Sequence, residues 1–337
     1  MNSINENISW INYVRVICMF FVFFLHTEYR ADFYFAGGTF DVFFTPFYVN
    51  AFFIVSGYLL FRKQERICLS LESTKVWFSK YGVIFLLNIL FKLIIPSILF
   101  AMFFFFPKII IRHQMIEYSA LLQQTIGGGA MWFISALVVA QFLIFILLYF
   151  QKFSLVLWCG YGICLLLLAF FLHVCGYNNF PWYYQSGMSA VFYLSFGAFF
   201  TKIEKCRLFQ KKYFMAFLLV CYLLFVYNIN PLINLTHMNI NIQGVLLSLM
   251  SSLILISFCK IIRPNKFIET IGKQTIGLYF LSGAVPEIVS KLVKSFLRFD
   301  NCIFFFVVCF SFVLSVVLNK LLLKYAGFMF DLRKLFK

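Results

Sequence analysis

Charged residues are scarce in this sequence. Only 12% of its 337 residues are Asp, Glu, Lys or Arg, whereas 63% are hydrophobic. Because soluble globular domains carry about 25% charged residues, this composition excludes a soluble protein and predicts one that is embedded in a membrane. The chain also lacks polar linkers and internal repeats, so we expect residues 1–337 to form a single domain.

The sequence lacks the short motifs of the common soluble enzymes. It has no Walker A loop, no dinucleotide-binding glycine pattern, no GxSxG, no HExxH and no Cys or His spacing typical of zinc sites. The cysteines, such as Cys18, Cys164 and Cys259, are scattered through apolar runs, and we interpret them as small buried hydrophobes. We therefore expect no metal site, no bound cofactor and no nucleic-acid partner. The formal charge of +16 is attributed to cytoplasmic loops beside anionic lipid.

Ten apolar stretches are long enough to cross a membrane as helices, since about 20 residues span its hydrocarbon core. The third is expected to tilt or to break at Pro96, which has no amide N–H to donate. The first has no basic cluster before it, so we interpret it as a span and not as a cleavable signal peptide. The expected spans are 8–28, 41–61, 82–106, 130–150, 154–173, 186–201, 213–229, 242–262, 274–292 and 302–323.

Lysine and arginine are distributed unevenly over the loops between these spans. With the N-terminus inside, most of them fall on cytoplasmic flanks, and this asymmetry predicts that both termini are cytoplasmic. The fold class is therefore an all-α polytopic bundle, and we expect spans one, two, three, four and nine to line a central cavity. The outer flanks keep only Arg30, Lys108, Arg112, Lys291, Lys294 and Arg298.

The first span carries two polar residues that lipid should exclude, Arg15 and His26. Eleven helical residues make about three turns, so both lie on one face, about 16 Å apart along the axis. A buried imidazole can take a proton from a hydroxyl, and a carboxylate such as Glu28 can orient it. Because helical positions two apart do not face each other, that pairing requires the helix to end at about Thr27. The alternative is a structural cluster of Arg15, His26 and Glu28.

Other candidate residues each have a structural alternative. Ser56 and Gly57 are typical of a close helix contact, or of room left for a ligand. Lys92 lies inside the third span, where a cation suits the polyphosphate of coenzyme A but can also snorkel to the interface. Trp132 is typical of an interfacial aromatic belt. The glycines at 127–129 favour a flexible turn over a ligand-binding backbone loop.

Further motifs accompany the Arg15 and His26 pair along the chain. They are FFIVSGYLL at 52–60, KLIIP at 92–96, WFI at 132–134, FYLSFGAF at 192–199 and IGKQTIGLY at 271–279. In this order they resemble the acyltransferase-3 family of integral membrane acyltransferases, which includes bacterial O-antigen and exopolysaccharide O-acetyltransferases. Ser282 stands where the family usually has a late histidine.

This resemblance implies a membrane-embedded transferase of the bacterial cytoplasmic (inner) membrane. It would move an acyl group, acetyl from acetyl-CoA in the typical case, to a hydroxyl of a cell-surface polysaccharide or its lipid-linked precursor. His26 would be the general base and Arg15 would position the acyl-CoA donor. The remaining expected contacts are Lys92 and Trp132 with the donor, and Ser56, Tyr279 and Ser282 with the acceptor glycan.

Two alternatives to acyl transfer stay open. One is an exporter of a glycan or another anionic substrate, and the other is a non-catalytic partner of a polysaccharide assembly complex. Intact Arg15 and His26 favour the enzyme, whereas the missing late histidine slightly favours the alternatives. Membrane lipid is an expected partner in every case.

Overall fold

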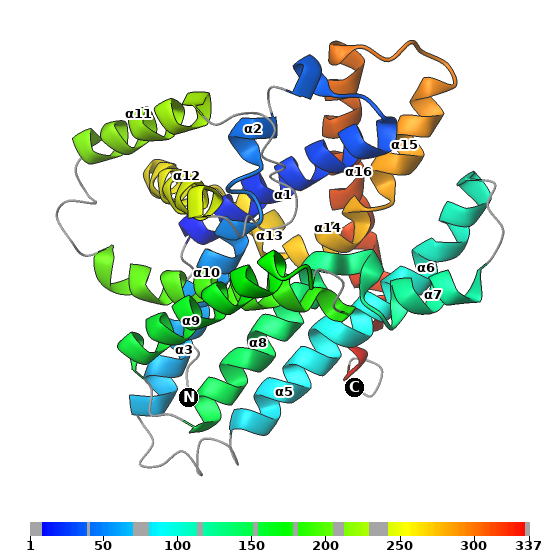
Figure 1. The fold of residues 1–337 in the computed structure, drawn as a ribbon. Coiled ribbons are helices and arrows are strands. Elements are labelled where there is room, and N and C mark those ends of the chain that lie inside the picture. The colour runs from blue at the N-terminus through cyan, green and yellow to red at the C-terminus, as the bar shows by residue number, and fades with distance from the viewer. Residues whose placement is uncertain are drawn as a thin grey trace. The chain divides into compact units, whose positions relative to one another are not determined.

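The computed structural model describes residues 9–38, 41–69, 81–112, 117–150, 154–177, 181–204, 212–228 and 242–333. Within these ranges the chain forms helices and turns and no β-strand, which confirms the all-α prediction (Figure 1). Two basic residues before the third predicted span, Lys75 and Lys80, and two of the four histidines, His113 and His237, lie outside the described ranges. The longer helices are α1 (Ser9–Ala31), α3 (Asn50–Leu69), α6 (Ile95–Arg112), α8 (Trp132–Phe150), α9 (Leu155–Val174), α10 (Tyr184–Ile203), α11 (Lys212–Asn228), α12 (Ile242–Ile261), α15 (Val285–Lys294) and α16 (Asn301–Tyr325).

Shorter helical elements complete the described chain. Most are single turns that connect the long helices or start them. They are η1 (Phe35–Gly38), α2 (Asp41–Phe44), α5 (Val83–Ile89), the π-helix η3 (Leu90–Ile94), α7 (Tyr118–Thr125), η4 (Gly129–Met131), η5 (Pro181–Tyr183), α13 (Lys266–Lys273), α14 (Thr275–Ser282) and η7 (Gly327–Met329).

Six of the described helices are long and apolar enough to cross a membrane, and each coincides with a predicted span. The bent pair α14 and α15 coincides with the predicted ninth span and would make a seventh. The polytopic membrane architecture is therefore confirmed, whereas the count of ten spans, the cytoplasmic termini and the central cavity stay predictions. The six are Ser9–Ala31, Val83–Phe106, Gly129–Tyr149, Leu155–Val174, Gln243–Ile261 and Asn301–Tyr325.

The predicted second span was wrong as a single helix over 41–61. The structure has the short α2, a turn, and then α3 from Asn50. Pro46 lies in this turn and has no N–H to continue a helical hydrogen-bond ladder. The side chain of Asn50 instead donates to the carbonyl oxygen of Pro46 at 2.8 Å and to Ser248 Oγ at 2.7 Å, which fixes the point where α3 begins.

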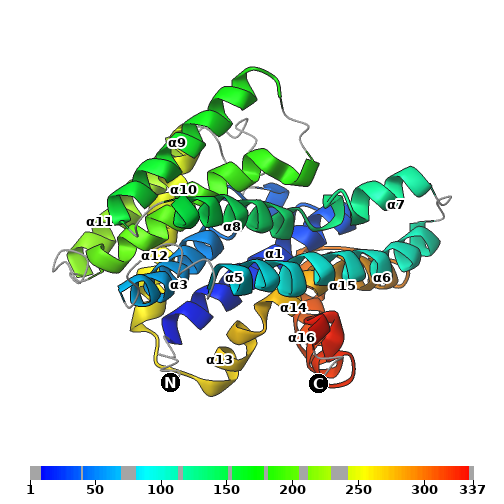
Figure 2. The same ribbon diagram turned by 90° about the horizontal axis from the view of Figure 1, so that it is seen from below.

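The third span continues through Pro96 instead of breaking there. The residues before the proline widen into the π-helix η3, in which Ile95 N–H donates to Leu90 O, five residues back. A π-turn lets the helix run past a residue that has no N–H. Figure 2 shows α5 leading through this segment into α6.

The chain folds into two compact units. The first comprises Met1–Phe52, Lys211–Asn234 and Leu246–Val316. In it, α1 packs against α13, α14 and α15 (Figure 2). Near the start of α1, the Tyr13 hydroxyl donates to Arg263 O at 2.8 Å. A Cβ on Gly272 of α13 would lie 2.6 Å from Asn12 O, so glycine is needed for this close approach.

The second unit comprises Phe53–Gln210, Leu235–Val245 and Val317–Lys337. Its α10 packs against both α8 and α9. The Phe85 ring of α5 stacks on the Phe145 ring of α8, with 6.0 Å between their centroids. After α16 the chain returns to the same unit, where η7 packs on α6.

Two glycines let the backbones of α3 and α10 touch within the second unit. A Cβ on Gly57 would lie 2.0 Å from Leu194 O, and a Cβ on Gly197 would lie 1.9 Å from Ile54 O. Both distances are far below van der Waals contact and involve backbone atoms that cannot rotate away. The interpretation of Gly57 as a helix-contact residue is therefore confirmed.

The cysteines differ from the interpretation as uniformly buried hydrophobes. Cys18 and Cys259 are buried, but Cys164 on α9 and Cys302 on α16 are exposed in the structure. A third exposed cysteine, Cys175, directly follows α9. Cys164 and Cys302 lie on long apolar helices. In a membrane such positions meet lipid, which accepts a small apolar side chain as readily as a protein core does.

The first prediction concerns the glycine contact of α3 with α10. We expect Gly57→Ala and Gly197→Ala each to lower the unfolding free energy by about 3 kcal/mol, at the upper end of overpacking costs. Thermal unfolding of the detergent-purified protein measures the effect. Gly160→Ala is the matched control, since a Cβ at Gly160 of α9 meets nothing within 4 Å. A Gly57→Ala variant as stable as the Gly160→Ala control would contradict this packing.

Candidate functional site

The imidazole of His26 is held by a backbone carbonyl from the predicted ninth span. His26 Nδ1 lies 2.9 Å from Ser282 O, and the ring is partly buried on α1. Both residues belong to the first unit. Because a carbonyl oxygen only accepts hydrogen bonds, Nδ1 must carry the proton in this contact. The neutral ring then has its lone pair on Nε2, which is the form of a general base.

Ser282 O can accept from a side chain because of a proline one turn later. In an unbroken helix, the carbonyl of residue 282 would accept from the N–H of residue 286. That residue is Pro286, which has no N–H and which lies in the first turn of α15. The ninth span accordingly bends by 44° where α14 ends and α15 begins. Because of Pro286, the Ser282 carbonyl oxygen has no helical N–H donor, and it accepts from His26 instead.

The side chain of Ser282 points to a different partner from its carbonyl. Its hydroxyl donates to Tyr279 O at 2.8 Å, within α14, and the residue is only 1% exposed. Tyr279 is also buried. The contact of Ser282 with His26 is thus made by its backbone, and acceptor binding by Ser282 and Tyr279 stays a prediction.

Glu28 lies two residues beyond His26 on a helix that does not stop. The condition for a pair of Glu28 and His26, a helix ending at about Thr27, is not met, because α1 continues to Ala31. Glu28 is 2% exposed, and its Oε1 accepts from the backbone N–H of Phe35 at 2.8 Å. This bond ties the segment after α1 back to the helix. A catalytic role of Glu28 stays a prediction.

The end of α1 is fastened to α15 by charged groups. Arg30 Nε lies 3.5 Å from Glu287 Oε2, and Lys291 Nζ lies 3.9 Å from Glu287 Oε1. The ammonium group of Lys294 donates to Ala31 O, a carbonyl at the end of α1. Glu287 is 2% exposed, and a buried carboxylate needs such cationic partners. These contacts hold His26 opposite Ser282.

Arg15 lies eleven residues before His26 on the unbroken α1, so the two share a helix face as predicted. Its side chain is half-buried. Within the part of the chain that the structure describes, no carboxylate forms an ion pair with it. A guanidinium at membrane depth needs an anion or a wet cavity, so this position is suited to an anionic ligand.

The other predicted site residues belong to the second unit. Ser56 lies on α3 beside the glycine contact. Trp132 begins α8 and is half-buried, with its ring centroid 6.3 Å from that of Tyr183. Lys92 lies in the π-helix and is exposed. The structure therefore brings His26 together with Ser282, and it describes Ser56, Lys92 and Trp132 within a different unit.

The triple glycine next to Trp132 forms a specific turn. Gly128 has a positive φ of 74°, and its carbonyl accepts from the Ser135 hydroxyl at 2.9 Å. The backbone N–H of Trp182 donates to Gly127 O at 3.4 Å. The amide N–H groups that a ligand would need are also used, since Gly127 N–H donates to Leu122 O at 2.9 Å and Gly128 N–H to Thr125 O at 3.3 Å. The structure therefore favours the turn interpretation.

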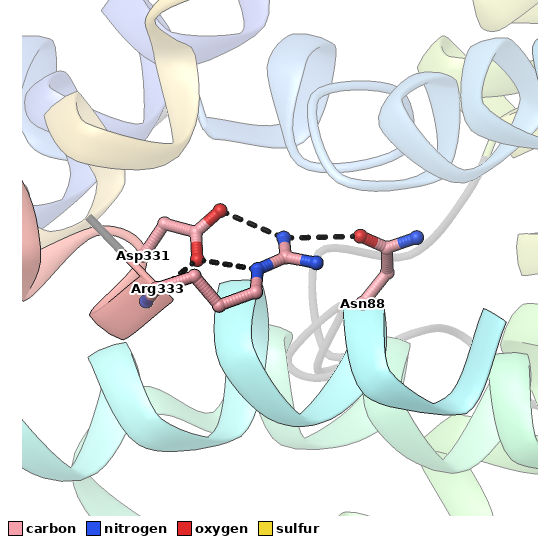
Figure 3. Close-up of polar contacts among 3 residues, drawn as sticks. All are labelled: Asn88, Asp331 and Arg333. Atoms are coloured by element: carbon pink, nitrogen blue, oxygen red, sulfur yellow. Dashed lines mark hydrogen bonds and ion pairs between the residues drawn. The ribbon is translucent and has the colours of Figure 1, made fainter. Parts of the chain in front are cut away.

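The segment after α16, which the sequence predicts as a cytoplasmic flank, carries the charged residues Asp331 and Arg333. The guanidinium of Arg333 donates from Nε to Asp331 Oδ1 at 2.8 Å and from Nη2 to Asp331 Oδ2 at 2.7 Å. Nη2 also donates to Asn88 Oδ1 of α5 at 3.2 Å, as Figure 3 shows. The partners are 245 residues apart in sequence, so no local pattern could have indicated this contact.

Comparison with protein families gives one match that covers nearly the whole chain. The profile of the acyltransferase-3 family, described as an acyltransferase domain, matches residues 8–320. The match includes Arg15, His26, Lys92 and Ser282. No curated protein and no solved structure matches the chain significantly.

The second prediction separates the structural role of His26 from any chemical role. Asn places an amide N–H near the position of Nδ1–H, so we expect His26→Asn to keep the bond to Ser282 O and to unfold within about 0.5 kcal/mol of wild type. His26→Ala removes the donor and leaves Ser282 O unpaired, which costs about 1–2 kcal/mol. Thermal unfolding in detergent checks both. Equal destabilisation by Asn and Ala would contradict the hydrogen bond.

Proposed function

Because the chain belongs to the acyltransferase-3 family, we propose that this membrane acyltransferase moves an acyl group from acyl-CoA to a hydroxyl of a cell-surface polysaccharide or its lipid-linked precursor. Acetyl-CoA is the proposed donor. The protein is a multi-pass membrane protein, and the bacterial cytoplasmic membrane is its proposed location. There, donor made in the cytosol meets glycan destined for the other face.

The observation that carries this proposal is the hydrogen bond of His26 Nδ1 with Ser282 O. It supports His26 as general base, with Nε2 taking the proton of the acceptor hydroxyl. The hydroxyl oxygen attacks the thioester carbonyl, the carbon–sulfur bond breaks, and the ester forms. The coenzyme A thiolate leaves and recovers the proton from the imidazolium. Ser282 O stabilises that imidazolium, because its bond to Nδ1–H strengthens when the ring becomes charged.

Arg15 supports the donor side of this reaction. It lies about 16 Å from His26 along one face of α1 and has no carboxylate partner in the described chain. An anionic donor that enters beside Arg15 would extend its thioester toward the imidazole. Lys92 and Trp132 are proposed to contact the nucleotide part, and Ser56 and Tyr279 the acceptor.

The third prediction tests catalysis in cells. In a strain that lacks the protein, we expect wild type to restore ester-linked acyl groups on the surface polysaccharide, and His26→Asn to restore less than about 1% of them, as removal of a general base predicts. His26→Gln is the second variant. Both variants should bind acetyl-CoA like wild type. If His26→Asn restores the esters fully, the enzyme proposal falls, and glycan export becomes the function to assay.

The fourth prediction concerns Pro286. In Pro286→Ala the new N–H of residue 286 competes with His26 for Ser282 O, so the imidazole loses its fixed tautomer. We expect kcat to fall about tenfold or more, while the KM for donor and the melting temperature stay unchanged.

Steady-state kinetics with purified enzyme and a glycan acceptor measure this effect. Pro264→Ala is the matched control, because Pro264 lies in the exposed connection between α12 and α13. A Pro286→Ala enzyme with wild-type kcat would show that the bend does not position the base.

A further inference from the structure

The segment after α16 folds back along the start of the third predicted span. Within the second unit, the Phe330 ring lies 5.2 Å from the Phe100 ring of α6, and η7 packs on the same helix. These contacts carry Arg333 to Asn88 of α5 and place its guanidinium over the Phe91 ring, 5.6 Å from the centroid. Arg333 is thus held by side chains of another helix as well as by its neighbour Asp331.

The Asp331 carboxylate occupies the binding face of this guanidinium. Both of its oxygens accept from Arg333, in the bidentate arrangement that arginine also offers to a phosphate group. The Arg333 side chain is 37% exposed and that of Asp331 is 17% exposed. The guanidinium thus keeps an exposed part while the carboxylate is in place, and Figure 3 shows the carboxylate and Asn88 on it.

A second cation lies on the same helical stretch. Lys92 is four residues after Asn88, on the same side of the helix one turn further along, and it is exposed. The hydrogen bond from Arg333 is the main cause that lowers the pKa of Asp331, and the charge of Lys92 lowers it further. The Asp331 carboxylate is thus hydrogen-bonded by Arg333, while Lys92 acts on it through its charge.

We infer that Arg333 and Lys92 form a phosphate subsite for the nucleotide end of the acyl donor, and that Asp331 holds the place of the phosphate until the donor binds. This inference rests on the proposed acyl-CoA-dependent function. A phosphate that replaces Asp331 keeps the bidentate geometry and brings more negative charge to both cations. Asn88 and Phe91 keep Arg333 in position during the exchange, because neither contact involves the carboxylate.

The subsite predicts binding changes of opposite sign at two adjacent residues. Asp331→Asn removes the competing charge, so we expect coenzyme A to bind about three- to tenfold more tightly. Arg333→Ala removes the bidentate donor, so we expect binding to weaken about tenfold or more. Arg333→Lys should also weaken binding, since an ammonium cannot offer the planar fork.

The experiment is calorimetric titration of full-length purified protein with coenzyme A and with 3′-dephospho-coenzyme A. Arg298→Ala and Glu117→Gln are the matched controls, because each removes an exposed charge elsewhere, and neither should change the affinity. Changes of opposite sign with coenzyme A support the subsite. If they vanish with 3′-dephospho-coenzyme A, the subsite holds the 3′-phosphate, and if they persist, it holds the pyrophosphate.

Other results would overturn the inference. If Asp331→Asn and Arg333→Ala both weaken binding and lower the melting temperature, the segment is only a structural latch. If neither changes binding while wild type and His26→Asn bind coenzyme A equally, the subsite falls and the proposed function stands. If wild type binds no coenzyme A, the donor assignment falls together with the subsite.

A lipid phosphate is the competing source of the same chemistry. To test this source, the protein is embedded in phosphatidylcholine nanodiscs and titrated with phosphatidylglycerol. If Asp331→Asn raises lipid affinity and leaves coenzyme A affinity unchanged, the ligand is a lipid headgroup and the donor subsite is overturned. If lipid affinity is unchanged and coenzyme A affinity rises, the donor subsite is supported.

Discussion

The hydrogen bond between His26 and the Ser282 carbonyl is the constraint on which the first unit depends. It requires α1 and α14 to hold a fixed register over their whole contact. Near the start of α1, Gly272 lets the backbone of α13 approach Asn12 closely. Near the end of α1, Arg30 pairs with Glu287 of α15. These two contacts hold α1 in register on either side of α14. The imidazole is therefore oriented by the Ser282 carbonyl oxygen of α14, and the packing of α13, α14 and α15 on α1 sets the position of that atom.

Charge is the second constraint, because every ionised group at membrane depth must be compensated. At the end of α1 the protein supplies its own compensation, in the buried Glu287 between Arg30 and Lys291. After the last predicted span, Arg333 is neutralised by Asp331. Arg15 differs, since the described chain provides no carboxylate for it. A half-buried cation that has no counterion among the described residues is the arrangement that an anionic substrate can complete.

The sequence predicted the long helices and the shared face of Arg15 and His26, but it did not predict contacts made by backbone atoms. Hydropathy located the long helices, and the eleven-residue spacing correctly placed Arg15 and His26 on one face. The orienting group of His26 could not be named, because sequence patterns indicate side chains such as Glu28, whereas the acceptor is a backbone oxygen. Pro286 was a visible signal, as it stands four residues after Ser282. The contact of Arg333 with Asn88 depends on tertiary structure alone.

Pro96 and Pro286 each interrupt the hydrogen bonding of an apolar span, and the structure accommodates the two interruptions differently. Each lacks the N–H that should pair with the carbonyl four residues earlier, and those earlier residues are Lys92 for Pro96 and Ser282 for Pro286. At Pro96 the helix widens into a π-turn that contains Lys92, and it continues. At Pro286 the helix bends, and the carbonyl is paired by a side chain from another helix. A proline inside an apolar span thus marks a place where helix hydrogen bonding is released, and here both places carry a residue of the candidate site.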